Sequence, residues 1–234
     1  MHISAKVNLS IYFFYDLVYK LIMYQQYSPN MLKTFEECPR KFDFRYIQGI
    51  QMPVNDEIFE FGKNIHALAS YYLRKENIDK MEKSLTDKES KVWNYLKSCK
   101  YFSYDVINTE YNLAVRVGKH FLGGRLDALV KNGEQYYILD YKTGSAPKNA
   151  KYDYQTMIYA LCVHEFFKTD NVIFVYIDLR HKEEVCIKLT ESLVSEYKSK
   201  LQQISEKIDT FEHAPKKQSC IDESNNCEFS IICY

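Results

Sequence analysis

The sequence of 234 residues has few glycines and prolines, no net charge and no long apolar run. Seven glycines and five prolines are too few for a low-complexity or fibrous chain. The 31 basic and 31 acidic side chains balance, so total charge does not indicate a nucleic-acid partner, although an acidic site can offset a basic groove. No internal repeat and no Walker-type phosphate loop occurs. With 46% hydrophobic residues, the chain can bury a core, and its length fits one ordinary domain.

The first 23 residues contain the most apolar stretch, from Ser10 to Met23. Asp16 and Lys20 interrupt it, so it is too short and too charged to span a membrane. No small-residue cleavage site follows it, which argues against a signal peptide. We therefore expect residues 1–23 to be an N-terminal extension without catalytic importance, either an amphipathic helix on the domain or a segment upstream of a working start at Met23. We expect residues 24–234 to form a single domain. These features favour a cytoplasmic protein that does not contact a membrane.

The hydrophobic periodicity predicts helices at both ends of the chain and strands in the middle. Ser28 and Pro29 suit the start of a helix, and Cys38-Pro39 suits its end. Helical spacing predicts helices over residues 30–37, 58–73, 87–98, 153–167 and 191–211. Alternation predicts strands over residues 106–117, 121–130, 136–141, 172–177 and 184–189. This order indicates an α/β domain with an antiparallel three-strand meander, a crossover helix and further strand structure.

Two aspartates and a lysine form the most informative group of polar residues. Asp127 lies in the second predicted meander strand, and Asp140 and Lys142 project from one face of the third. If these strands pair through the Asn132-Gly133 turn, the two carboxylates come close together, which is unfavourable unless a cation neutralises them. Mg²⁺ or Mn²⁺ suits such oxygen ligands. With a lysine to orient or deprotonate a water, the group fits phosphodiester hydrolysis. A lone Asp-x-Lys on a strand is more often a surface ion pair, so the spacing alone leaves both interpretations open.

Around these residues, the chain resembles the RecB-like PD-(D/E)XK nucleases, including the CRISPR-associated RecB-like exonucleases and the AddB-type iron–sulfur nuclease domains. GGRLDALV and YYILDYKTG look like the GxxD…(D/E)xK core of that family, and Gln155 and Tyr159 match its QxxxY motif. Residues 61–66 resemble its G-x-x-x-H helix. Residues 27–42 resemble its S-x-S-x-L…CPRKF segment, with Asn30 in place of the second serine. Single motifs of this kind are weak, but five in family order are specific. The resemblance implies a restriction-endonuclease-like core with a mixed central sheet flanked by helices.

The resemblance also implies a role for individual residues. The implied metal ligands are His66, Asp127, Asp140 and the carbonyl group of Tyr141. Lys142 would position or activate the attacking water, and Gln155 and Tyr159 would support the site or contact the DNA strand. A lone histidine on a helix usually fills a satisfied core position, but the motif around His66 favours the ligand interpretation. Glu110, in the strand before Asp127, fits a solvated carboxylate better than a residue of the cleft.

Four of the seven cysteines lie outside the periodic apolar segments: Cys38, Cys220, Cys227 and Cys233. Disulfide frameworks are rare in cytosolic proteins, so metal ligation is the alternative for these cysteines. Many members of the resembled family hold an iron–sulfur cluster between one N-terminal and three C-terminal cysteines. Ser224 stands where the middle C-terminal cysteine is expected, so Cys220 becomes the alternative ligand of a 4Fe-4S cluster. Zinc suits the same four thiolates, and a degenerate site without metal is a third interpretation.

The sequence therefore predicts a divalent-metal-dependent DNA nuclease, with exonuclease character, in DNA repair, recombination or defence. A helicase or another repair or defence subunit would be its partner, because the sequence contains no motor motif. One alternative is a CRISPR-associated exonuclease that trims DNA for spacer acquisition. The other is a non-catalytic DNA-binding or scaffold subunit of a helicase–nuclease complex, although the presence of Asp127, Asp140 and Lys142 gives no reason for inactivity.

Overall fold

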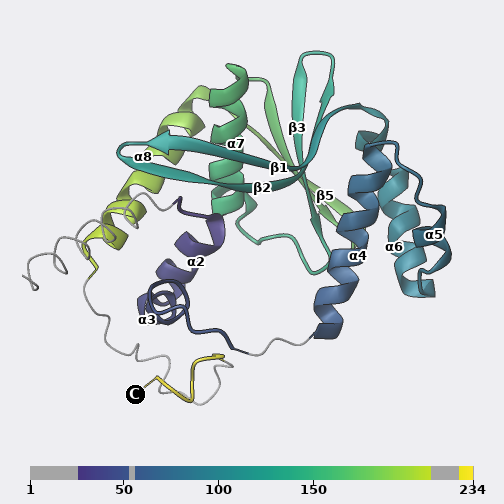
Figure 1. The fold of residues 1–234 in the computed structure, drawn as a ribbon. Helices are drawn as coiled ribbons and strands as arrows, with labels where there is room; N and C mark the ends of the chain where they lie inside the picture. Colours follow the sequence, from purple (N-terminus) through teal and green to yellow (C-terminus); the bar gives the residue numbers. More distant parts are fainter. Residues whose placement is uncertain (1–25, 53–55, 212–226, 234) are drawn as a thin grey trace, which may run out of the picture.

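A five-stranded mixed sheet with helices on both faces organises the molecule in a computed structural model that describes residues 26–52, 56–211 and 227–233 (Figure 1). The strands lie in chain order: β1 (Asp105–Val117), β2 (His120–Asn132), β3 (Gln135–Lys142), β4 (Val172–Asp178) and β5 (Glu183–Lys188). β1, β2 and β3 form the predicted antiparallel meander, whereas β3 and β4 are parallel and β5 is antiparallel to β4. The crossover between β3 and β4 contains the 14-residue helix α7 (Tyr154–Phe167). The predicted α/β class and mixed sheet are therefore confirmed.

The helices divide between the two faces of this sheet. The larger core packs α2 (Pro29–Glu37), α7 and α8 (Glu191–Asp209) against one face. The smaller core packs α4 (Asp56–Leu73) and α6 (Asp87–Ser98) against the other. Neighbouring residues in each strand point to opposite faces, so Leu129 joins the larger core and Val130 joins the smaller one. Helices thus cover both faces of the sheet. The central strands are accordingly nearly continuous runs of apolar residues.

Local sequence signals explain where the first helices begin and end. The Ser28 hydroxyl accepts a hydrogen bond from the Met31 amide, and Pro29 occupies the first turn of α2. α2 ends at Glu37 because Cys38 precedes a proline and adopts an extended conformation. Cys38 then caps the short helix α3 (Pro39–Phe42), which continues into the π-helical turn η1 (Asp43–Ile47). Neither α3 nor η1 has enough residues to show an apolar period, so the periodicity did not predict them.

Most predicted boundaries agree with the structure within two residues. Three further short elements were not predicted: α5 (Asp79–Lys83), η2 (Lys100–Ser103) and η3 (Ala150–Tyr152). The predicted extension over residues 1–23, Cys220 and Ser224 lie outside the described residues. Within the described part of the chain, no helix is both long and apolar enough to cross a membrane.

Candidate active site

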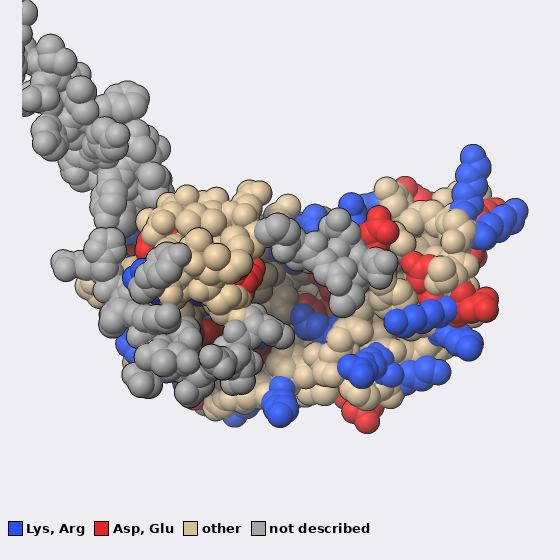
Figure 2. All heavy atoms as spheres, turned by 90° about the horizontal axis from the view of Figure 1, so that it is seen from below, with Lys and Arg blue, Asp and Glu red and all other residues tan. Residues whose placement is uncertain are grey.

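The predicted site residues lie where α4 meets the middle of β2 and the end of β3. Thr143 follows the last residue of β3, and its hydroxyl oxygen lies 3.4 Å from the position that a Cβ on Gly62 of α4 would occupy. This close approach brings the next turn of α4, which carries His66, against the meander. A pocket of about 670 Å³ opens here, with α4 on one wall and Glu110, Arg125 and Thr143 on the other. Figure 2 shows that this side of the molecule is hollowed near its middle and that acidic and basic side chains line the hollow.

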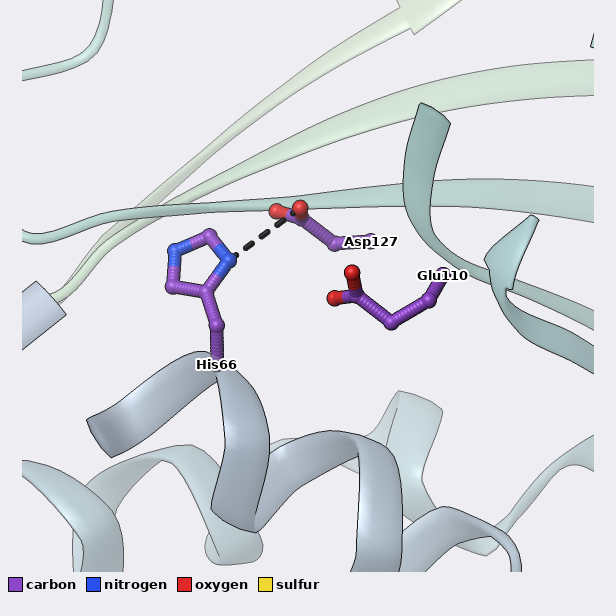
Figure 3. A group of neighbouring side chains, drawn as sticks. All are labelled: His66, Glu110 and Asp127. Atoms are coloured by element: carbon purple, nitrogen blue, oxygen red, sulfur yellow. Dashed lines mark hydrogen bonds and ion pairs between the residues drawn. The ribbon is translucent and has the colours of Figure 1, made fainter. Parts of the chain in front are cut away.

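Three side chains are arranged to share a metal ion: His66, Glu110 and Asp127. One ligand atom from each lies within 4.8 Å of the others, and Figure 3 shows the two carboxylates and the imidazole pointing toward one another. All three are half-buried. Two carboxylates and one imidazole are a donor set that suits Mn²⁺ and leaves Mg²⁺ compatible through its oxygen ligands. These residues therefore fit the divalent ion that the sequence motifs imply.

Hydrogen bonds fix the orientation of His66 and Asp127 relative to β3. His66 Nδ1 lies 3.1 Å from Asp127 Oδ1, and His66 Nε2 lies 2.9 Å from the Tyr141 carbonyl oxygen. The Tyr141 amide in turn donates a hydrogen bond of 2.8 Å to Asp127 Oδ2. The structure thus brings together His66, Asp127 and the Tyr141 carbonyl, three of the four predicted ligands. Each of them is held by its neighbours in the site.

Asp140, the fourth predicted ligand, belongs to a second network with Lys142 and Gln155. Lys142 Nζ lies 2.8 Å from Asp140 Oδ2 and donates a hydrogen bond of 2.6 Å to Gln155 Oε1. The Gln155 amide donates a hydrogen bond of 3.1 Å to Asp140 Oδ1. Gln155 therefore contacts both members of the Asp-x-Lys motif from the first turn of α7. Its amide holds the carboxylate and the ammonium in one fixed geometry.

Burial and charge change the protonation of this site. Burial, followed by the negative charge of Asp127, raises the pKa of Asp140 to about 6, although Lys142 and His66 oppose this shift. Burial alone lowers the pKa of His66, but its hydrogen bond to Asp127 and the charges of Asp127 and Asp140 outweigh burial and raise it. The negative charge of the site's carboxylates therefore exceeds the compensation that the surrounding positively charged and hydrogen-bonding groups provide. A bound cation would relieve this excess.

Tyr159, one turn after Gln155, packs against β2 at a position that requires glycine. A Cβ on Gly124 would lie 2.8 Å from the Tyr159 hydroxyl oxygen, so no larger residue fits there without moving the tyrosine. Burial, together with the charges of Asp140 and Asp127, raises the pKa of Tyr159. The phenol thus stays protonated at neutral pH. This contact gives a physical reason for the second glycine of GGRLD.

Glu110 belongs to the metal group, although its sequence context favoured a solvated carboxylate outside the cleft. Thr109 pairs with Ala128 and Tyr111 with Leu126, so Glu110 stands across from Asp127. Its backbone is left-handed, with φ of +51°, and its carboxylate is paired with Arg125 at 2.8 Å. The pairing register counted back from the tight turn at Gly118-Lys119 would have placed Glu110 opposite Asp127. We expected a solvated strand carboxylate, and the structure instead places it in the site.

The described cysteines of the predicted cluster lie at the contact between the C-terminal tail and the α3–η1 segment. Cys38, Cys227 and Cys233 are free thiols. Cys227 and Cys233 pack with Phe44 and Phe229 in a small apolar cluster, and Glu228 forms ion pairs with Arg45 and Lys41. Cys38 lies at the start of α3, three residues before Lys41. The two chain segments that carry these thiols therefore meet. Cys220 lies outside the described residues.

Comparisons with known proteins agree with this fold. The sequence model of the PD-(D/E)XK nuclease superfamily matches residues 26–234, so the chain belongs to this superfamily. A similar curated protein is the CRISPR-associated exonuclease Cas4 of Francisella tularensis subsp. novicida, at 27% identity over 126 residues. That alignment covers 53% of this chain and 61% of the relative, so the match spans less than two thirds of the relative's length.

A solved structure with the same fold comes from Eubacterium rectale, where the protein is named as a candidate exonuclease. The two structures align with a TM-score of 0.53 over 96% of this chain and all of the other. Only 9% of the aligned residues are identical, so this similarity concerns the fold alone. It agrees with the mixed sheet and flanking helices described above.

Proposed function

We propose that this protein is a divalent-metal-dependent nuclease that hydrolyses phosphodiester bonds in DNA, with exonuclease character. The observation that carries the proposal is the adjacency of two networks: the metal group of His66, Glu110 and Asp127, and the ion pair of Asp140 with Lys142. The domain that performs this function would comprise residues 24–234. A DNA substrate also fits the predicted cytoplasmic location.

The proposed chemistry assigns a separate task to each network. His66, Glu110, Asp127 and the Tyr141 carbonyl would hold the divalent ion, with Asp140 completing the ligands. When bound, such an ion supplies positive charge that stabilises a phosphate transition state and makes a nearby water more acidic. Lys142, fixed by Gln155, would orient the attacking water and offset negative charge on the phosphate. Gln155 acts on the reaction through the groups it holds, so it is a positioning residue.

The decisive experiment is a nuclease assay with a labelled oligonucleotide in Mg²⁺ or Mn²⁺. We expect Lys142→Ala to lower the cleavage rate by about 100-fold or more, the range typical for loss of a catalytic acid–base group, and Asp140→Ala to lower it at least as much because it removes a proposed metal ligand. Binding of the oligonucleotide should persist in Lys142→Ala. If the wild-type protein cuts no substrate and binds DNA equally with and without metal, the catalytic proposal is wrong and a DNA-binding or scaffold role replaces it.

A narrower candidate function is CRISPR-associated DNA trimming, together with the protein partners that such a system requires. It is favoured by the similarity to the Francisella exonuclease and by no feature of the site itself. Co-purification of the chain from its own host separates this role from general repair. A complex with CRISPR integration proteins is expected in the first case, and a complex with a helicase in the second.

We also propose a metal centre at the tail, held by Cys38, Cys227, Cys233 and Cys220. Three of these residues lie on chain segments that meet in the structure, and their thiols are not used in disulfides. Four thiolates suit a 4Fe-4S cluster, with zinc as the alternative. Anaerobic purification followed by iron and zinc analysis and visible absorbance distinguishes the two metals. Cys227→Ser is the control that should lose the bound metal.

A further inference from the structure

The solvent-facing side of α4 carries a row of residues that leads away from the metal group. Lys63, Ala67 and Tyr71 follow one another at intervals of four residues, so they lie on one face of the helix, and Arg74 directly follows its last residue. All four line the 670 Å³ pocket that also contains His66 and Glu110. The row is therefore part of the same concave surface as the metal group. It has no role in the chemistry proposed above.

Tyr71 and Arg74 form a flat, charged platform at the far end of this row. The Arg74 guanidinium carbon lies 4.8 Å from the centre of the Tyr71 ring. Arg74 Nε donates a hydrogen bond of 2.7 Å to Glu76, which restrains the guanidinium. The Tyr71 side chain is nevertheless 38% exposed. Two planar groups are thus held together at the surface, although neither is needed to fill a core.

The position of this platform suits a nucleobase. Tyr71 is five residues after His66 on α4, and both residues line the same pocket. Nucleobases stack on tyrosine rings and on arginine guanidinium groups irrespective of their sequence. Lys63, at the pocket beside the metal group, provides positive charge for a neighbouring phosphate. Figure 2 shows that acidic side chains are mixed with basic ones around α4, α5 and α6, so charge alone would not guide a strand along this surface.

We propose that Tyr71 and Arg74 form a base-stacking subsite for the nucleotide adjacent to the hydrolysed phosphodiester. This inference rests on the proposed nuclease function and adds how the substrate strand is positioned. A base that is paired within a duplex has its faces covered by neighbouring bases. The subsite therefore accepts a base only from an unpaired or frayed strand.

Tyr72 provides a matched control within the same helix. It is 39% exposed, almost the same as Tyr71, but it packs against Trp93 and Phe102 and lines a different pocket. The two tyrosines thus differ in the direction they face and not in solvent exposure. Removing either one deletes the same chemical group from α4.

The first test measures cleavage of a single-stranded oligonucleotide as a function of its concentration. We expect Tyr71→Ala to raise KM by about tenfold, a change typical for one lost stacking contact, with kcat changed less than about twofold. Tyr71→Phe should behave like the wild type because the ring is kept. Tyr72→Ala should leave KM unchanged. Hydrolysis of bis(4-nitrophenyl) phosphate, which has no base, should be equal in all four proteins and reports that each site is folded.

The second test moves a single abasic nucleotide stepwise along the strand near the cleaved end. Wild-type cleavage should slow by about tenfold at one position only, and Tyr71→Ala should show no such dependence. An unchanged KM for Tyr71→Ala, or equal sensitivity of both proteins to the abasic position, would overturn the subsite while the nuclease proposal stands. If the wild type hydrolyses neither the oligonucleotide nor the small diester, the nuclease proposal itself fails.

Discussion

The candidate active site and the cysteine-bearing tail are stabilised in different ways. Asp140 and Tyr141 are buried residues of a central strand, with the two large cores of the protein on either side. The described tail, residues 227–233, has a separate cluster with only three buried members, Phe44, Phe229 and Cys233. Charged groups of the active site can be held against their mutual repulsion because the sheet around them is rigid. The tail has few apolar contacts, so a metal centre there would contribute much of its stability.

The largest effect is expected from Asp140→Asn, which tests the site, where a buried carboxylate is destabilised by its surroundings. The pKa of Asp140 is raised to about 6 from its ordinary value near 4, so the folded protein binds a proton more tightly than the unfolded chain does. Its contribution to stability is therefore fully present below pH 4 and is lost as the pH rises through 6. Two pKa units correspond to about 3 kcal/mol. We expect the metal-free variant to gain about this much stability relative to the wild type between pH 3.5 and pH 7.

Urea unfolding at both pH values, in the presence of a chelator, measures this difference. Addition of Mg²⁺ or Mn²⁺ at pH 7 should stabilise the wild type more than the variant, because only the wild type has the full excess of negative charge. A variant whose stability relative to the wild type does not change with pH would show that the carboxyl group of Asp140 is not destabilised by its surroundings. The variant should also lose nuclease activity.

Phe229→Ala tests the tail, which has the smaller apolar cluster, and should have the next largest effect. The Phe229 side chain is 1% exposed and contacts Phe44 with ring centres 5.5 Å apart. Its removal should destabilise docking of the tail by about 2 to 3 kcal/mol, toward the low end for a buried phenylalanine because the cluster is small. Faster hydrogen exchange of residues 227–233, with little change in the exchange of β3, is the expected result. Equal effects on both segments would mean that the tail and the sheet unfold together.

Glu110→Gln should have a smaller effect that is confined to metal binding. The amide keeps one oxygen near His66 and Asp127 but removes a negative charge, so we expect Mn²⁺ affinity to fall by about tenfold. Isothermal titration calorimetry measures the affinity directly. Glu134→Gln is a suitable control, because Glu134 is a carboxylate in the turn between β2 and β3 and is not part of the metal group. Equal affinities for the wild type and Glu110→Gln would remove Glu110 from the metal site.

The smallest predicted effect concerns Asp209 at the end of α8, whose side-chain partners Tyr27, Lys119 and His120 belong to neither region. Burial alone raises its pKa, but hydrogen bonds from Lys119, His120 and Tyr27 outweigh burial and lower it. The stability from this carboxylate is therefore present above pH 4 and is lost as the pH falls further. Asp209→Asn should cost about 1 kcal/mol at pH 7 and less at pH 3, as measured by urea unfolding. Nuclease activity at pH 7 should not change.

Much of the fold was predictable because its elements are long and strongly periodic. A turn between β2 and β3 was evident from Asn132-Gly133; the structure makes it one residue later, at Gly133-Glu134, and the resulting register aligns Asp127 with the end of β3. Short elements such as α5 were not, because five residues do not display a period. The parallel pairing of β3 with β4 follows from the crossover through α7.

The residues of the candidate site that belong to sequence motifs could be predicted. The residues that reach the site only through tertiary structure could not. His66, Asp127, Gln155 and Lys142 each belong to a motif, and the structure brings all of them together. Glu110 belongs to no such pattern. It reaches the site only because β1 pairs with β2 in one register and because its backbone is left-handed. The hydrogen bonds of Gln155 to both Asp140 and Lys142 likewise depend on where α7 packs, which its sequence spacing does not specify.

The left-handed backbone at Glu110 also has a consequence for engineering. A non-glycine residue in this conformation costs about 1 to 2 kcal/mol, so Glu110→Gly would relieve local strain. A screen for thermostable variants would therefore be expected to favour glycine at this position and, with it, loss of the carboxylate that faces His66 and Asp127. If Glu110 holds the metal ion as proposed, stability and activity are opposed at this residue. Any stabilised version of the protein should keep Glu110 and gain its stability elsewhere.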